Sequence, residues 1–302
     1  MKKFVLGLFL ILLVSGCSGM PDIFSGLLPG GDSKVNKSEA SPDLISIQNL
    51  RSIPTPPINS GDSFSVTFEL VNQDEIKEVP ITYELFDYGL CTPPTSDTNI
   101  TTPLSISPLG TEWKEWTFTA PSNSLIAGLT TKCPIRFKVS YDWNATSQID
   151  ADVISVDRYN EMQRTGQIPS YTPSLSVGRG PIKVYFSFGA SLPIRTGSTL
   201  PIFILVEDKG TGLLGNIPDG KLTLKFGGLS DVDCGSRFTS CGAGSCTNNG
   251  TIPMIRKKSP QLRCTAKAPT VTIEKTYYIT ASLDYSYDLI GEVSVEVKPF
   301  LT

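Results

Sequence analysis

The most constraining feature of this chain is a run of alternating apolar residues that occurs twice. The first copy, residues 64–70, has an apolar side chain at every second position, with serine, threonine or glutamate between them. The second copy, residues 200–206, is apolar on both sides. Each copy is preceded by the same five-residue pattern, Pro-Ile-x-Ser/Thr-Gly, at residues 57–61 and 193–197. A period of two residues is typical of a β-strand that buries one face. We therefore expect the chain to build the same β-unit twice, with the outer face of the second copy covered.

Two later segments extend this internal repeat. Residues 119–121 correspond to residues 267–269, each with an Ala-Pro pair, and the alternating run 137–143 corresponds to 279–285. The separation between matching residues begins at 136, reaches 148 and ends at 142. The increase falls on a cysteine-rich stretch, which we interpret as an insertion in the second copy.

Short β-patterned runs separated by proline, glycine, asparagine and aspartate continue through both copies. Several such strands without alternating helical segments are the pattern of a β-sandwich. We therefore predict an all-β protein with two immunoglobulin-like antiparallel β-sandwich domains in tandem. The first domain covers residues 43–158 and the second, with the cysteine-rich insertion, covers 181–302. Between them, residues 159–180 form a linker, with a short helix predicted over 157–164.

The N-terminus has the features of a secretory signal peptide. Two lysines precede an apolar run, residues 4–14, which is followed by Ser15-Gly16-Cys17. These 11 residues form about 16 Å of helix, too short for a hydrocarbon core of about 30 Å. We interpret residues 1–16 as a lipoprotein signal peptide, because small residues before Cys17 resemble a lipobox. An ordinary signal peptide with an incidental cysteine is the alternative.

Lipidation of Cys17 would anchor the protein to the outer face of the cell membrane. Residues 17–42 contain glycine, serine, proline and charged residues with little apolar periodicity. Such a segment is typical of a flexible tether, with a span of about 25–30 Å. The sequence therefore predicts an extracytoplasmic, lipid-anchored protein.

Six cysteines remain after Cys17, and an even number in a secretory context predicts disulfides. Only two lie in the first half, so Cys91 is expected to pair with Cys133, which stabilises by about 4 kcal/mol in the chain-entropy model. The other four allow three pairings, and the sequence leaves the choice open: Cys234, Cys241, Cys246 and Cys264. A zinc site built from these four thiolates is the alternative. The absence of a Cys-x-x-Cys pair and the oxidising context favour disulfides and no metal.

Composition disfavours several function classes. The chain has no histidine, which excludes nucleophile systems with a histidine base and histidine metal ligands. Its net charge is −3 and its longest basic run is Arg256-Lys257-Lys258, expected in a solvated loop, so a nucleic-acid partner is not predicted. We expect no cofactor and no enzymatic activity, although carboxylate-based catalysis stays open.

Three groups of residues are weaker candidates for a site. Asp231 and Asp233 suit calcium but lack an EF-hand pattern and are interpreted as turn residues. Asp74, Glu75 and Asp219 are likewise interpreted as turn residues. Aromatic residues that suit a ligand platform are interpreted as core residues: Trp113, Trp116, Trp143, Tyr277, Tyr278, Tyr285 and Tyr287. Four Asn-x-Ser/Thr sequons are candidate glycosylation sites, expected in exposed loops: Asn36, Asn99, Asn144 and Asn249.

The strand after Gly61, which leads to Val71-Asn72-Gln73, resembles the opening of CARDB-type domains. These are immunoglobulin-like, adhesion-related modules of bacterial and archaeal surface proteins. The second copy has Asp208-Lys209-Gly210-Thr211-Gly212 at the matching turn. The chain is also similar to archaeal cell-surface lipoproteins with tandem domains of this kind. The resemblance covers about 30 residues in each half. It implies an extracellular, non-catalytic role and brings no active-site residues with it.

Together these observations predict a surface-anchored lipoprotein that acts as an adhesion, binding or scaffolding module. Its partners are expected to be the membrane, through the lipid, and an extracellular protein or glycan. Binding is expected in loops of the sandwiches, with the segment 234–246 as the best single candidate. Two alternatives stay open. One is a structural subunit of a cell-envelope or surface assembly, and the other is a carboxylate-dependent enzyme that acts on extracellular glycans.

Overall fold

The computed structural model describes residues 43–95, 98–167, 171–239, 241–242 and 244–300. The predicted signal peptide, Cys17, the tether to residue 42 and the sequon at Asn36 lie outside these residues. Within them, nearly all regular structure is β-strand, so the predicted all-β class is confirmed. One α-helix, α1, covers Val156–Thr165 and includes the predicted helix. Ser155 caps its first turn and Gly166, in the left-handed conformation, ends it.

The strands have the following bounds: β1 Ile45–Ile53, β2 Ile58–Asn59, β3 Ser63–Asn72, β4 Val79–Asp87, β5 Asn99–Ile106, β6 Thr111–Thr119, β7 Thr131–Ile154, β8 Leu175–Val177, β9 Ile182–Phe188, β10 Ile194–Arg195, β11 Thr199–Asp208, β12 Leu213–Leu214, β13 Leu222–Phe226, β14 Ser230–Asp233, β15 Ser245–Thr247, β16 Leu262–Lys267 and β17 Glu274–Lys298. A short 3-10 helix, η1, covers Gly235–Arg237.

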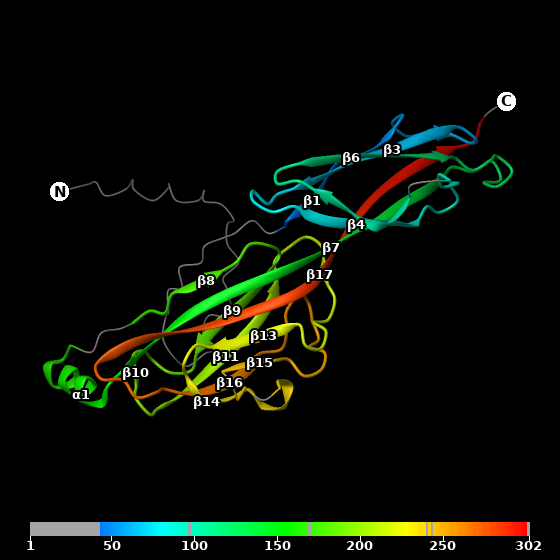
Figure 1. The fold of residues 1–302 in the computed structure, drawn as a ribbon. Helices are drawn as coiled ribbons and strands as arrows, with labels where there is room; N and C mark the ends of the chain where they lie inside the picture. Colours follow the sequence, from blue (N-terminus) through cyan, green and yellow to red (C-terminus); the bar gives the residue numbers. More distant parts are fainter. Residues whose placement is uncertain (1–42, 96–97, 168–170, 240, 243, 301–302) are drawn as a thin grey trace, which may run out of the picture. The chain divides into compact units, whose positions relative to one another are not determined.

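Three sheets make up the fold (Figure 1). A three-stranded sheet has the order β1-β3-β6, and a four-stranded sheet has the order β14-β16-β11-β9. The third sheet has ten strands, with the main order β15-β13-β17-β7-β4-β5 and with β2, β8, β10 and β12 on its two long strands. Both smaller sheets pack on the face of the large sheet that carries its buried side chains. This arrangement is an antiparallel β-sandwich architecture.

Strands β7 and β17 lie side by side through the whole fold (Figure 1). They pair in one unbroken antiparallel register, from Thr131 opposite Val297 to Ile154 opposite Glu274. Along β7, every odd-numbered residue from 133 to 153 except Trp143 is buried, while the even-numbered residues up to 152 are exposed or half-buried. The period-two pattern seen in the sequence therefore continues along a strand of 24 residues.

The internal repeat is present in the backbone. Ser63 pairs with Thr119 in the first half, and Thr199 pairs with Lys267 at the matching positions of the second. Equivalent turns close both units: the amide of Ala120 donates to the oxygen of Asp62, and the amide of Ala268 to that of Ser198, both at 2.9 Å. The glycines before these turns, 61 and 197, have φ of 80° and 79°, which an L side chain rarely adopts.

The structure does not confirm two separate tandem domains. The first part of β7 pairs with β4 and the first part of β17 pairs with β13. Each long strand then continues into the other half. The end of β17 pairs with the start of β7, and the end of β7 pairs with the start of β17. Trp143 lies opposite Tyr285, its own counterpart in the repeat, so a local two-fold axis passes between them. Each half therefore completes the sheet of the other.

Aromatic residues join the two sheets of the first half. The ring of Phe68 on β3 lies 4.3 Å from that of Phe137 on β7, and Trp116 on β6 lies 5.1 Å from the same ring. All three side chains are fully buried. In the second half, Phe203 and Leu205 on the outer side of β11 are only half-buried, so the expected cover of that face is partial.

We predict that a change near the end of β17 destabilises the first half of the protein. A Cβ at Gly291 would lie 2.2 Å from the ring of Phe137, so Gly291→Val should cost about 2–3 kcal/mol through overpacking. Fluorescence of Trp116 during urea unfolding measures this loss. The control is Gly215→Val, where a Cβ meets nothing within 4 Å. An unchanged midpoint for Gly291→Val would contradict the strand sharing.

Candidate functional site

Three disulfides are present among the described residues. Cys91 pairs with Cys133 as predicted, and this bridge ties the loop before β5 to the start of β7. In the second half, the pairs are Cys234–Cys264 and Cys241–Cys246, which resolves a choice that the sequence left open. Bridges of this kind are typical of proteins from an oxidising, extracytoplasmic environment.

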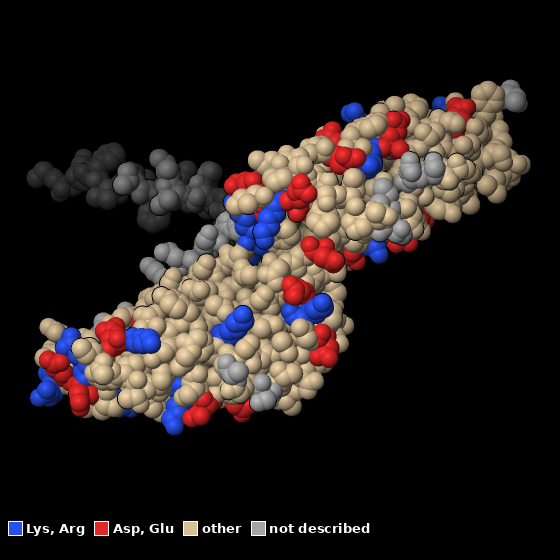
Figure 2. Space-filling model, in the orientation of Figure 1, with Lys and Arg blue, Asp and Glu red and all other residues tan. Residues whose placement is uncertain are grey.

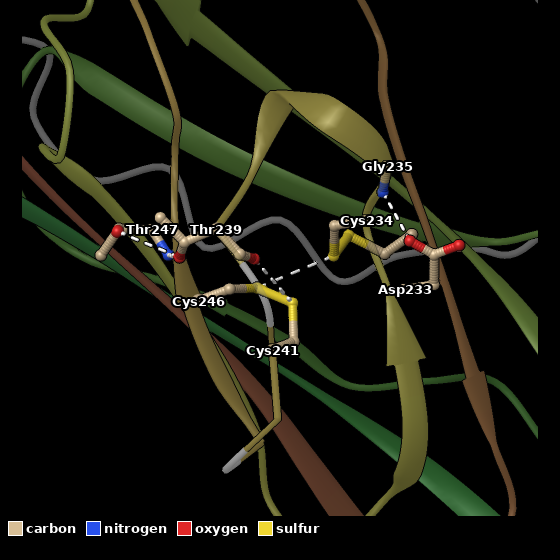
Figure 3. Close-up of a disulfide and its surroundings, with 8 residues drawn as sticks. Asp233, Cys234, Gly235, Thr239, Cys241, Cys246 and Thr247 are labelled. Atoms are coloured by element: carbon tan, nitrogen blue, oxygen red, sulfur yellow. Dashed lines mark hydrogen bonds between the residues drawn. A yellow bond between two sulfur atoms is a disulfide. The ribbon is translucent and has the colours of Figure 1, made fainter.

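The cysteine-rich segment, residues 234–246, is held by both of the later disulfides (Figure 3). Cys234 is bonded to Cys264 on β16, and Cys246 lies on β15, which belongs to the large sheet. The Sγ atoms of Cys246 and Cys234 are 3.9 Å apart, so the two bridges pack against each other. The four cysteines therefore link the described ends of the segment to both sheets of the second half.

Backbone hydrogen bonds order the same segment. The amide of Thr239 donates to the oxygen of Thr247 at 2.8 Å, and the amide of Thr247 donates to Oγ1 of Thr239 at 3.0 Å. Within the segment, the side chain of Phe238 is buried. Ser236 and Arg237 remain exposed, and Arg237 has no ion pair within the described part of the chain. The described part of the segment therefore presents the polar side chains of Ser236 and Arg237 from a hydrogen-bonded backbone.

The zinc alternative would require free thiolates. The sulfurs of Cys234, Cys241 and Cys246 lie within 4.8 Å of one another, which is a suitable spacing for one ion. In this structure all three belong to disulfides and offer no thiolate. The cluster is therefore arranged as a covalent cross-link.

The acidic candidates at 231 and 233 have structural partners. Asp231 lies 3.5 Å from Nζ of Lys267, and Oδ1 of Asp233 accepts from the amide of Gly235 at 2.8 Å. Asp74 likewise accepts from the amides of Ile76 and Lys77. Asp219 accepts from the amide of Gly250. The backbone-amide contacts of Asp74, Asp219 and Asp233 are those of turn residues, as the sequence predicts. The prediction is wrong for Asp231, which lies within β14 and forms an ion pair, and Glu75 forms an ion pair with Arg179.

Most of the aromatic candidates are core residues. Trp116, Tyr277, Tyr285 and Tyr287 are buried, and Trp143 is half-buried. Two do not follow the core interpretation: Trp113 on β6 and Tyr278 on β17 are 55% and 51% exposed. The strand alternation places both on outer faces of their sheets.

The sequons differ in their surroundings. Asn99 and Asn249 are exposed, whereas Asn144 lies in the middle of β7. The side-chain amide of Asn144 donates to Oγ of Ser282 and Oδ1 of Asp284 at 2.8 and 2.7 Å. The expectation that the sequons lie in exposed loops is therefore confirmed for Asn249 and wrong for Asn144, which belongs to a cross-strand ladder. Asn99 is exposed but is the first residue of β5 and pairs with Glu84.

A polar pocket that the sequence analysis missed lies on the outer face of the large sheet. Its volume is about 380 Å³. Residues of β7, β13 and β17 and the segment 176–178 line it: Thr146, Ser147, Gln148, Ser176, Gly178, Thr223, Lys225, Thr280, Ala281 and Ser282. Isolated Ser and Thr residues on four separate strands carry no motif, so only the pairing register brings them together.

The basic run at 256–258 is exposed and forms a turn, as expected of a solvated loop, and Lys257 also contacts the turn at 208–212. Nζ of Lys257 donates to the oxygens of Gly210 and Gly212 at 2.5 and 3.1 Å. The carboxylate of Asp208 in this turn is buried and accepts from the hydroxyl of Tyr287 at 2.9 Å. Burial, with the charge of Asp208, raises the pKa of Tyr287. The turn at residues 208–212 is therefore held by polar side chains.

Charged groups of both signs are interspersed over the visible face of the molecule, which is mostly uncharged (Figure 2). None of the described helices is long and apolar enough to cross a membrane.

No protein-family model and no curated protein matches this chain. Red sea bream transglutaminase is 8% identical with a TM-score of 0.19, over 87% of this chain and 32% of that one. A mutant of the CFA/I adhesin CfaE of enterotoxigenic E. coli is 7% identical with a TM-score of 0.14, over 89% and 90%. The chain spans about a third of the length of the transglutaminase. Scores this low carry no argument. The fold and bridges define the chain as a disulfide-bonded β-sandwich protein.

One buried lysine lies beside the pocket. Lys183 on β9 is 5% exposed, and its Nζ donates to the oxygen of Gly178 at 2.8 Å. Burial lowers the pKa of Lys183 from 10.5 to about 8. Between these two pH values the unfolded chain holds a proton that the folded chain has lost, so the free energy of unfolding rises with pH.

We predict that Lys183→Met raises stability at pH 7 and flattens this pH dependence. The wild type should gain stability from pH 8 to 10.5 relative to the variant, by at most about 1.4 kcal/mol per pH unit, the limit for one proton. Urea unfolding at several pH values measures the difference. Exposed Lys132, changed to Met, is the control. Parallel stability curves for Lys183→Met and the wild type would contradict the lowered pKa.

Proposed function

We propose that this protein is a surface-anchored lipoprotein that binds an extracellular macromolecule, a protein or a glycan, and that it does not catalyse a reaction. The observation that carries the proposal is the cysteine-rich segment. Two packed disulfides and a set of backbone hydrogen bonds hold it, while Ser236 and Arg237 stay exposed. A segment that is already ordered loses little conformational entropy when a partner docks.

The pocket supports binding over glycan hydrolysis. Glycoside hydrolases of the usual type place two carboxyl groups about 5–10 Å apart across the scissile bond. None of the ten residues that line the pocket is an aspartate or a glutamate. Its side chains are hydroxyls, one amide and one ammonium, which hold a ligand without supplying a proton donor and a carboxylate nucleophile.

Anchoring through Cys17 is the part of the proposal that rests on the N-terminal sequence. Cys17 follows an apolar run of signal-peptide length and two small residues. A lipid at this position would keep the described β-structure on the outer side of the membrane.

We predict that Cys17→Ala moves the protein from the membrane to the soluble extracytoplasmic fraction. The measurement is fractionation of cells that process lipoproteins, with immunoblotting. Ser18→Ala, next to the proposed lipid site, is the control and should stay in the membrane fraction. Equal membrane retention of Cys17→Ala would contradict lipid anchoring and leave an ordinary signal sequence as the explanation.

We predict that reversing the charge of the cysteine-rich segment weakens partner capture. The variant Ser236→Glu/Arg237→Glu keeps all six cysteines and should reduce capture at least about tenfold, the effect of losing roughly 1.4 kcal/mol at an interface. Binding of envelope and extracellular fractions to the full chain in vesicles measures this. Lys132→Glu, an exposed charge reversal on β7, is the matched control.

Two outcomes of this experiment would contradict the proposal. Unchanged capture by the double variant would remove the segment as the contact surface. Failure of the wild type to capture anything, together with self-association in sedimentation, would favour a structural subunit of a surface assembly.

A further inference from the structure

The pocket is built from two parallel rows of residues that cross four neighbouring strands. In one row the register aligns Lys225, Thr280, Gln148 and Ser176. In the next row it aligns Thr223, Ser282 and Thr146, and Gly178 closes the row through its amide, which donates to the oxygen of Thr146 at 2.8 Å. Both rows lie on the outer face of the large sheet, because their neighbours along each strand are buried.

The charge of the pocket comes from one residue. Lys225 is the only ionisable side chain among the lining residues, and no salt bridge involves it in the described part of the structure. The remaining polar groups are hydroxyls of serine and threonine and the amide of Gln148. The pocket therefore offers a single positive charge surrounded by neutral hydrogen-bonding groups.

The first half of the protein shows what the same positions look like when they are satisfied internally. The local two-fold relates Lys225 to Glu84 and Thr280 to Lys138, which face each other on β4 and β7. There Glu84 and Lys138 form an ion pair at 3.7 Å. In the second half Lys225 stands at the position of Glu84 and Thr280 at the position of Lys138, so an ammonium faces a neutral hydroxyl and the ion pair is lost.

The second row, which contains Ser282 and Thr146, has also lost a carboxylate relative to the first half. The counterparts of Ser282 and Thr146 are Ser140 and Asp288, and the hydroxyl of Ser140 donates to Oδ1 of Asp288 at 2.6 Å. In the second half the carboxylate position is occupied by Thr146, which adds a further neutral group. Compared with the first half, the second half therefore lacks the carboxylates at the positions of Glu84 and Asp288, and its one cation, Lys225, occupies the position of Glu84 beside hydroxyls.

We propose that this pocket binds an acidic sugar unit, a ring that carries several hydroxyls and one carboxylate. This inference rests on the proposed binding function and gives it a ligand class. The carboxylate pairs with Lys225 in a charge-assisted hydrogen bond, and the ring hydroxyls bond to the serine, threonine and glutamine side chains. A volume of about 380 Å³ is in the range of small-ligand sites.

Exposed Tyr278 supports a sugar ring as the occupant. It lies two residues before Thr280 on β17 and on the same outer face, next to the Lys225 row, with 51% of its surface exposed. An exposed aromatic ring beside hydrogen-bonding groups offers an apolar surface to the C–H face of a sugar. The lining contains no large apolar side chain, which disfavours a lipid.

The experiment compares glucuronate, glucose and acetate as probes of the full chain, by calorimetry and ligand-observed NMR. Glucuronate should bind at least about tenfold more tightly than glucose or acetate, because it alone provides both the carboxylate and the hydroxyls. Lys225→Met should reduce glucuronate binding to the level of glucose. Lys225→Arg should retain it, and Thr223→Tyr, which fills the pocket, should abolish binding of all probes.

Lys132→Met, which removes an exposed lysine from the same face of β7, is the matched control and should bind as the wild type does. Equal unfolding midpoints for Lys225→Met and the control establish that the variant is folded. Acetate binding as tight as glucuronate binding would overturn the sugar assignment. No binding of glucuronate, or unchanged binding to Lys225→Met, would overturn the site.

Failure of this site is distinguishable from failure of the proposed function. If the full chain still captures a macromolecule, and the charge reversal in the cysteine-rich segment still weakens capture, the binding function stands and the acidic-sugar pocket does not.

Discussion

The unbroken pairing of β7 with β17 is the interaction on which the rest of the structure depends. Each strand starts in the sheet of its own half and ends in the sheet of the other, so neither half has a complete large sheet alone. Strand pairing between segments about 140 residues apart is non-local and costs chain entropy before it gains contacts. The contacts that repay this cost are the buried odd-numbered residues on both strands.

The alternation in the sequence was enough to predict the strands and their buried faces, but not the sharing of strands. A period of two residues says which side chains face inward, and that reading is correct for Phe64 to Leu70 and for Phe137 to Tyr141. It says nothing about which strand lies alongside. The continuation of the same alternation past Trp143 was the available signal, because a strand that ends with its own domain needs no second apolar run.

For the candidate sites too, local sequence patterns predicted some features, and features that depend on strand pairing were not predicted. Cysteine count and spacing predicted that the bridges exist and that Cys91 pairs with Cys133. The later pairing depends on which strands lie opposite each other, which no local pattern encodes. The buried amide of Asn72 shows the intermediate case. The sequence pattern placed it at the end of the strand after Gly61, while its hydrogen bonds to the oxygens of nearby Lys77 and of Ile106, 34 residues away, could not be predicted from that pattern.

The two proposed binding features share one structural support. Strand β15, which carries Cys246, pairs with β13, and Ser245 lies opposite Lys225 in that register. The edge of the pocket and the end of the cysteine-rich segment are therefore neighbours on one sheet. An exposed edge strand is a template for pairing with another chain, and β15 is an edge strand of the large sheet. The insertion in the second repeat supplies this edge strand, which covers β13 and the backbone of Lys225 on the side away from β17.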